Sequence, residues 1–203
     1  MTYLKNELFF QEKTPLSAYW AGFIAADGCI RTDPNNKCIS INLSLKDQIL
    51  LDRLKYDSKY SGPIYHNIKT CYINFYNYNQ WKTDLSFIYN ITERKTLTLL
   101  PPNITDIQLI YPYIIGYIDG DGSICNTRGK QVEFYLCGSS KPTIEWINHH
   151  LYNLQKDDYK KMKVYSRMTC KSTHLLYELK TSGKRALDLL TKLRNKYDGN
   201  VLD

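Results

Sequence analysis

The sequence lacks the features that define several common protein classes. Its six cysteines include no C-x-x-C pair, and no two of them lie within four residues of each other, which argues against a structural zinc site. No apolar run approaches the ~18 residues that a membrane-spanning helix needs. No signal-peptide pattern precedes the core, and a chain of 203 residues needs no disulfides to fold. These absences predict a cytoplasmic protein with reduced thiols and no membrane span.

Two ligand-binding motifs are absent or incomplete. The chain has no Gly-Lys-Ser/Thr loop of the kind that cradles phosphates. Residues 119–123 begin like a calcium-binding loop, but Ile124 stands where that loop needs glycine and Lys130 where it needs glutamate. A phosphate loop and a helix-loop-helix calcium site are therefore excluded.

The chain is basic but unevenly so. It has 27 Lys and Arg against 20 Asp and Glu, a net charge of +7, which permits a polyanionic partner. Residues 101–140 nevertheless carry 2 basic and 4 acidic residues, so this acidic segment needs a local explanation. The 18 tyrosines suit a wet polar interface, although a coding bias toward Asn, Lys, Ile and Tyr explains them equally well.

The chain contains an internal repeat with a spacing of 94 residues. Residues 20–30 read WAGFIAADGCI and residues 114–124 read IIGYIDGDGSI. A similar series of elements follows each copy. We expect strands within 37–43, 64–76, 131–136 and 163–180, and helices over 47–56, 80–89, 142–154 and 183–193. The order predicts an α+β fold of two αββαββα repeats.

The repeat also predicts the domain organisation. The first repeat covers residues 1–91 and the second covers residues 111–203. Residues 92–110, which contain Pro101 and Pro102, form the expected linker. Period-two alternation gives each predicted antiparallel sheet one apolar face against helices and one polar, aromatic face toward water.

Small residues recur at helical spacing in both copies of the repeat. Gly22 with Ala26, and Gly116 with Gly120, place a surface without large side chains on one face of each helix. Packing of each helix on its own sheet is one explanation. Glycine costs about 1 kcal/mol inside a helix, however, so its recurrence favours close packing of the two helices against each other.

Each of these helices is expected to end at an Asp-Gly pair. Gly28 and Gly122 stand where helix-stopping glycines occur. If the helices pack together, Asp27 and Asp121 meet where the helix dipoles are negative, and this arrangement needs divalent cations. A single Asp-Gly pair is more simply a solvated turn, but two copies in matching context favour a metal site that cleaves phosphodiesters.

The two repeated segments resemble the LAGLIDADG motif of homing endonucleases. Asp27 and Asp121 match the metal-binding acid of that motif, Asp119 matches its first acid, and Ala25 replaces the first acid in the other copy. The resemblance implies a monomer whose two sheets form a saddle on double-stranded DNA. It also implies a double-strand break that depends on Mg²⁺ or Mn²⁺, with Ca²⁺ as a non-cleaving substitute, and backbone carbonyls of Ala26 and Gly120 as further ligands.

The same resemblance points to a basic residue after the last helix of each repeat. Lys95 stands at that place in the first half and is the expected catalytic cation, although a solvated linker charge explains it equally well. Residues 200–203 lead to the matching place in the second half without a Lys or Arg, which predicts unequal cutting of the two strands. The alternative functions are an RNA-binding intron maturase, and a DNA-binding protein that nicks or does not cleave.

The polar strand faces and nearby basic residues are the expected DNA contacts. Two sheets that each span ~30 Å predict a long, asymmetric target of roughly 18–22 base pairs. The candidate contact residues are Arg31, Lys37, Ser40, Asn42, Tyr72, Asn74, Tyr76, Arg128, Gln131, Glu133, Tyr135, Lys163, Arg167 and Lys171.

Overall fold

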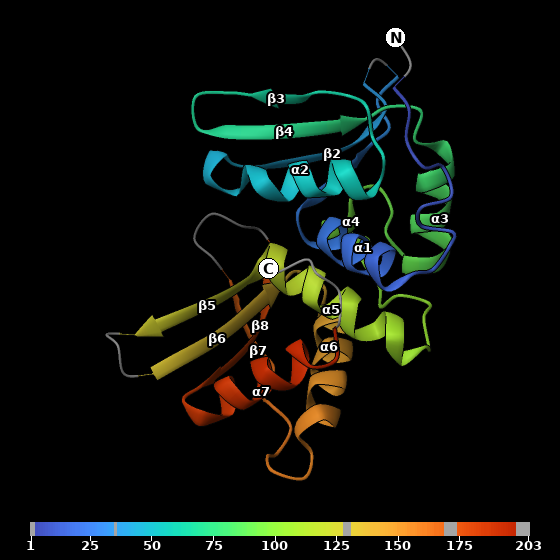
Figure 1. The fold of residues 1–203 in the computed structure, drawn as a ribbon. Coiled ribbons are helices and arrows are strands. Elements are labelled where there is room, and N and C mark those ends of the chain that lie inside the picture. The colour runs from blue at the N-terminus through green and yellow to red at the C-terminus, as the bar shows by residue number, and fades with distance from the viewer. Residues whose placement is uncertain (1–2, 35, 128–130, 169–173, 198–203) are drawn as a thin grey trace.

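The fold consists of two similar halves that meet along a central pair of helices (Figure 1). A computed structural model describes residues 3–34, 36–127, 131–168 and 174–197. The elements of the first half are α1 (Pro15–Asp27), β1 (Gly28–Arg31), β2 (Cys38–Ser44), η1 (Leu45–Asp47), α2 (Gln48–Asp57), β3 (Ile64–His66), β4 (Thr70–Phe75) and α3 (Asn79–Tyr89). The short helix α4 (Lys95–Thr98) follows.

The second half repeats the same order. Its elements are α5 (Ile107–Asp121), β5 (Gly122–Thr127), β6 (Gln131–Gly138), α6 (Lys141–Gln155), β7 (Tyr165–Met168), β8 (Leu175–Ser182) and α7 (Lys184–Arg194). The predicted α+β fold with two αββαββα repeats is confirmed. Helix α4 and the first turn of α5 lie within residues 92–110, and the expected boundaries of the linker stay a prediction.

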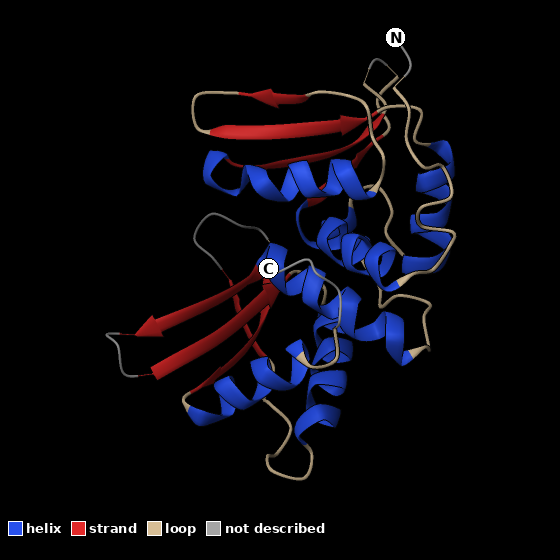
Figure 2. Ribbon diagram, in the orientation of Figure 1, coloured by secondary structure: helices blue, strands red, loops and turns tan. Residues whose placement is uncertain are grey.

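Each half contains one four-stranded antiparallel sheet (Figure 2). The strand orders are β1-β2-β4-β3 and β5-β6-β8-β7, so the two sheets have the same topology. Equivalent residues share the register, since Gly28 pairs with Ile41 and Gly122 pairs with Leu136. No described helix is long and apolar enough to cross a membrane.

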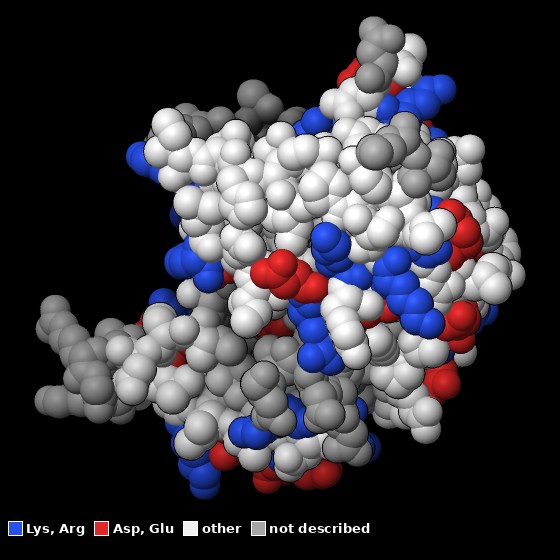
Figure 3. All heavy atoms as spheres, turned by 45° about the horizontal axis from the view of Figure 1, so that its top comes forward, with Lys and Arg blue, Asp and Glu red and all other residues white. Residues whose placement is uncertain are grey.

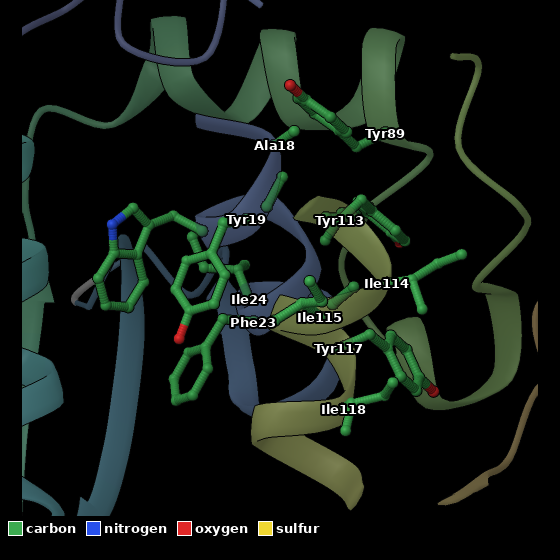
Figure 4. Packing of buried hydrophobic residues seen from close by; sticks show 14 of the residues in the cluster. Ala18, Tyr19, Phe23, Ile24, Tyr89, Tyr113, Ile114, Ile115, Tyr117 and Ile118 are labelled. Carbon is green, nitrogen blue, oxygen red and sulfur yellow. The ribbon is translucent and has the colours of Figure 1, made fainter. Parts of the chain in front are cut away.

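Helices α1 and α5 lie side by side between the two sheets and supply the centre of the core (Figure 4). Thr14 begins α1 by accepting a hydrogen bond from the backbone amide of Ser17, and Asp106 begins α5 by accepting one from Gln108. Both helices are buried over most of their length because each packs on the other helix and on its own half. The C-terminal ends of α1 and α5 therefore lie close together at the junction of the two halves.

The small residues of the repeat make this packing close and reciprocal. A Cβ added to Gly22 would overlap the carbonyl oxygen of Tyr113, and a Cβ added to Gly116 would overlap the carbonyl oxygen of Tyr19. Gly120 faces Ala26 in the same interface. The expectation that the two helices pack against each other through these residues is confirmed.

The two glycines that follow these helices have an extended backbone, not a left-handed one. Gly28 and Gly122 have extended backbones, with φ of −74° and −90°. A Cβ on Gly28 would lie 2.7 Å from the carbonyl oxygen of Ile24, and Gly122 meets Ile118 in the same way. Glycine is needed here because the chain passes directly from helix to strand, against the carbonyl group one turn earlier.

The expectation that both polar sheet faces open to water is wrong for part of the first sheet. Ser40 and Asn74, which pair across β2 and β4, are only 4% and 8% exposed. The amide nitrogen of Asn74 donates a hydrogen bond to the hydroxyl of Tyr76 at 3.4 Å. These two shorter polar side chains are therefore buried in the face that was expected to meet water.

Candidate functional site

Asp27 and Asp121 are the last residues of α1 and α5, and the close helix packing brings their carboxyl groups into one electrostatic environment. The charge of Asp27 contributes to the pKa of Asp121, and Lys95 interacts with both acids. A small cavity of about 220 Å³ opens beside them. Its lining is Ala25, Ala26, Lys95, Thr96, Leu99, Tyr117, Asp121, Cys137, Gly138, Ser139 and Leu176.

Lys95 bonds to the carboxyl end of α1. It is the first residue of α4, and its ammonium group donates hydrogen bonds to the carbonyl oxygen of Ala25 at 2.7 Å and to that of Ala26. Helix ends expose carbonyl groups without intrahelical partners and carry partial negative charge, so they attract cations. Burial lowers the pKa of Lys95, while Asp121 and Asp27 raise it. Lys95 is thus a cation held within the site.

The two acids have unequal surroundings. The pKa of Asp121 is raised to about 6, because burial and the charge of Asp27, which raise it, outweigh Lys95 and the hydroxyl of Tyr117, which lower it. Burial also raises the pKa of Asp27, which lies at the more exposed side of the site; Lys95 lowers that pKa and Asp47 raises it. The second acid is therefore more enclosed than the first.

Asp119 has a structural role in the helix interface. Its Oδ2 accepts a hydrogen bond of 2.8 Å from the hydroxyl of Tyr19 on the other helix. Burial raises the pKa of Asp119, and this hydrogen bond lowers it. Ala25 takes the equivalent place in the first copy and offers no such acceptor. Asp119, at the position of the first acid of the motif, therefore links the two halves and does not line the cavity.

The donor chemistry of the site fits a hard divalent cation. Asp27 and Asp121 supply carboxylate oxygens, and the last turns of α1 and α5 supply carbonyl oxygens, which are the ligands that Mg²⁺ and Ca²⁺ prefer. Among the described residues no cluster of three or more His, Cys, Asp or Glu forms a ready-made metal site. The carbonyl of Ala26, which the motif resemblance predicts as a ligand, bonds to Lys95 instead. The ligand set stays a prediction.

The expected DNA contacts of the first half divide between strand and loop positions. Alternation and register place Arg31, Asn42 and Tyr72 on one face of the first sheet, together with the shielded Ser40 and Asn74. Tyr72 stacks on Tyr65 with ring centroids 5.1 Å apart. Lys37 is exposed just before β2, and Tyr76, 37% exposed, follows β4.

In the second half the expected contacts are partly bound to one another. The guanidinium of Arg167 pairs with Glu178 and donates a hydrogen bond of 3.2 Å to the hydroxyl of Tyr135. The ammonium of Lys163 lies 5.2 Å from the ring centre of Tyr165. Gln131 and Glu133 share the face of Tyr135 by strand alternation, and the predicted contacts Arg128 and Lys171 lie outside the described residues. Every DNA contact stays a prediction.

The side of the molecule shown in Figure 3 carries Lys and Arg interspersed with Asp and Glu, and its upper part is largely uncharged. The net charge of +7 is therefore not gathered into one continuous basic surface on this side. The strand faces stay the predicted place of polyanion binding.

Several contributors to the site were not predicted from the sequence. Tyr117 and Cys137 line the cavity with Asp121, Tyr19 bonds to Asp119, and Glu178 pairs with Arg167. Only Tyr117 left a signal in the sequence, because it precedes Asp121 by four residues and so lies on the same helical face. The others come from elements far apart in the chain.

Comparison with solved structures identifies the fold. The N-terminal LAGLIDADG domain of DUF199/WhiA is 17% identical, with a TM-score of 0.53 over 98% of this chain and 90% of that one. The homing endonuclease I-GzeII, in complex with its DNA target, is 13% identical, with a TM-score of 0.52 over 91% of this chain and 84% of that one. The meganuclease I-CpaMI, bound to uncleaved DNA, is 13% identical, with a TM-score of 0.50 over 94% of this chain and 86% of that one.

Sequence comparison adds nothing to this likeness, because no family model matches the chain and no curated protein matches it. The structural matches cover nearly the whole chain and extend through both repeats. The chain thus has the two-repeat fold that LAGLIDADG homing endonucleases and the LAGLIDADG domain of WhiA share.

Proposed function

We propose that this protein is a site-specific DNA endonuclease that makes a metal-dependent double-strand break in a long asymmetric target. The observation that carries the proposal is the convergence of Asp27, Asp121 and Lys95 at the ends of two tightly packed helices. Two carboxylates at negative helix ends repel each other unless cations hold them together. A cation site between two halves of a DNA-sized saddle is suited to phosphodiester hydrolysis.

The residues at the site would have different roles in the proposed reaction. Asp27 and Asp121 would hold Mg²⁺ or Mn²⁺, with the carbonyls of Ala26 and Gly120 as candidate further ligands, and Ca²⁺ would bind without supporting cleavage. A bound divalent ion supplies Lewis-acid activation of water and charge neutralisation at the leaving oxygen. Lys95 places a positive charge against both acids, close to where phosphate charge would accumulate.

The two sheets would bind the DNA on the faces opposite their helices. Both sheets have the same topology but different side chains, so each half reads a different half-site as a single chain. The first sheet offers Arg31 together with amide, hydroxyl and tyrosine groups, whereas the second carries the pair of Arg167 and Glu178. A monomer with an asymmetric target follows from this difference, and the length of roughly 18–22 base pairs is the one that the sequence predicts.

The decisive experiment selects the target and then tests cleavage. Randomised duplexes are selected for binding in Ca²⁺, and a plasmid that carries the selected sequence is incubated with protein in Mg²⁺. Linear product supports the proposal, and Asp27→Asn and Asp121→Asn should each abolish cutting while they preserve binding. Specific binding without cleavage in Mg²⁺ or Mn²⁺ would contradict the proposed endonuclease activity.

A DNA-binding protein that nicks or does not cleave is the second candidate. The observation that favours it is the ammonium group of Lys95, which already bonds to the carbonyl group of Ala26 at the predicted metal site. Nicked circles in the same assay would identify a nickase, and intact plasmid with specific binding would identify a non-cleaving protein. Competition by structured intron RNA but not by duplex DNA would identify the maturase alternative.

A further inference from the structure

Tyr117 and Asp121 are one helical turn apart on α5 and face the same cavity. The ring of Tyr117 is buried, with only 2% of the residue exposed, and its hydroxyl acts on the Asp121 carboxylate by lowering the pKa of that acid. A phenol hydroxyl beside a carboxylate can only donate to it, so the protein itself offers Asp121 a hydrogen-bond donor.

Gly138 of β6 makes room for this hydroxyl. A Cβ added to Gly138 would lie 2.6 Å from the Tyr117 hydroxyl oxygen, which is too close for any side chain. Gly138 also lines the cavity that contains Asp121. The sheet of the second half therefore accommodates the tyrosine in the place where it meets the acid.

The first half has no such arrangement. The repeat spacing of 94 residues places Phe23 at the position of Tyr117 and Asp27 at the position of Asp121. Phenylalanine has no hydroxyl, so Asp27 receives no hydrogen bond from its own helix at this place. The two acids are equivalent in sequence but differ in how firmly the protein holds them.

We infer that Tyr117 is a positioning residue that fixes the carboxylate of Asp121 for cation binding and makes the second half-site better organised than the first. The inference rests on the proposed function and deepens it. A hydroxyl that donates to one oxygen favours one orientation of the carboxylate, so the remaining oxygen keeps a defined direction. Hydrogen bonds to a metal-binding carboxylate raise affinity by about 10- to 100-fold in other proteins.

Four variants test the inference. Tyr117→Phe removes only the hydroxyl, and Gly138→Ala keeps the hydroxyl but displaces it. Tyr113→Phe is the matched control, since it deletes another buried hydroxyl on α5 that has no hydrogen-bond partner. Phe23→Tyr introduces a hydroxyl at the equivalent position of the first half.

Two readouts separate positioning from folding. Electron paramagnetic resonance of free Mn²⁺ measures cation affinity without cleavage, both for the protein alone and for its DNA complex in metal-limited titrations. Cleavage of a duplex labelled differently on each strand gives the Mg²⁺ concentration needed for each cut. Thermal unfolding in EDTA checks that the variants are folded.

We expect Tyr117→Phe and Gly138→Ala to weaken Mn²⁺ binding by about 10-fold and to raise the Mg²⁺ requirement of one strand more than the other. Tyr113→Phe should match the wild type, and Phe23→Tyr should make the two strands more alike. Wild-type affinity and strand balance in Tyr117→Phe would overturn this inference while leaving the proposed function intact. A wild-type protein that neither binds Mn²⁺ nor cuts would overturn both.

Discussion

The hydroxyl of Tyr19 on α1 donates a hydrogen bond of 2.8 Å to Oδ2 of Asp119 on α5, across the pseudo-twofold axis that relates the two halves. The equivalent tyrosine, Tyr113, has a buried hydroxyl without a partner. Ala25 stands where the first half would need an acid. The interface is thus symmetric in its backbone and asymmetric in its polar contacts.

This asymmetry predicts opposite outcomes for two similar substitutions. Tyr19→Phe should lower the free energy of unfolding by about 1–3 kcal/mol, because it leaves the half-buried Asp119 without its donor. Tyr113→Phe should have little effect or should stabilise the protein, since it removes an unpaired polar group. Urea unfolding followed by circular dichroism measures both, and equal losses in the two variants would contradict the prediction.

The closest approach of the two helices predicts strong sensitivity to one methyl group. Gly22→Ala or Gly116→Ala should cost about 3 kcal/mol, because each Cβ would overlap a carbonyl oxygen of the opposite helix. The double variant should cost less than the sum, since either substitution already separates the helices. Urea unfolding of the three variants tests this, and strict additivity would argue against a shared contact.

Lys95 is predicted to matter for cleavage more than for DNA binding. Lys95→Met removes the positive charge that faces both acids, so cleavage should fall by about 100-fold. Lys192→Met is the control, because the Lys192 ammonium pairs with Asp158 on the surface at 2.8 Å. Strand cutting and gel-shift binding in Ca²⁺ are measured side by side, and wild-type cutting by Lys95→Met would exclude Lys95 from the chemistry.

The raised pKa of Asp121 predicts a pH-dependent cost to folding. Its pKa of about 6 exceeds the unfolded value, so the folded state binds more protons between about pH 4 and 6 and loses stability as pH rises through that window. In EDTA, Asp121→Asn should therefore match the wild type at pH 4 and exceed it by up to about 3 kcal/mol at pH 8.

A surface acid provides the control for that measurement. Lys192 holds the pKa of Asp158 below its usual range, so Asp158→Asn should slightly reduce stability at pH 8. Chemical unfolding at the two pH values compares the variants. A loss of stability at pH 8 in Asp121→Asn would show that Lys95 more than offsets the burial of this acid.

The pair between Arg167 and Glu178 predicts an effect on DNA affinity. Glu178→Gln should free the guanidinium for phosphate, so binding should tighten and its salt dependence should steepen. Arg167→Ala should reduce the slope of log affinity against log salt by about 1. Salt titrations in Ca²⁺ measure both slopes, and unchanged slopes would place Arg167 away from the DNA.

The sequence by itself determined the element order, the two acids and the helix faces that meet. The 94-residue repeat identified Asp27 and Asp121 together, because the same local pattern occurs twice in the sequence. Glycine at four-residue spacing predicted close helix packing, since only small residues allow backbones to approach. These features depend on neighbours along the chain, which the sequence shows directly.

Only the tertiary structure decided which groups surround those acids. Tyr19 meets Asp119 across 100 residues, and Lys95 reaches the carbonyl group of Ala26 across 69. Strand alternation placed Ser40 on a polar face, but burial depends on which neighbours are large, and there the expectation of exposure was wrong. Periodicity fixes the direction of a side chain, whereas its partners and its exposure follow from how separate elements pack.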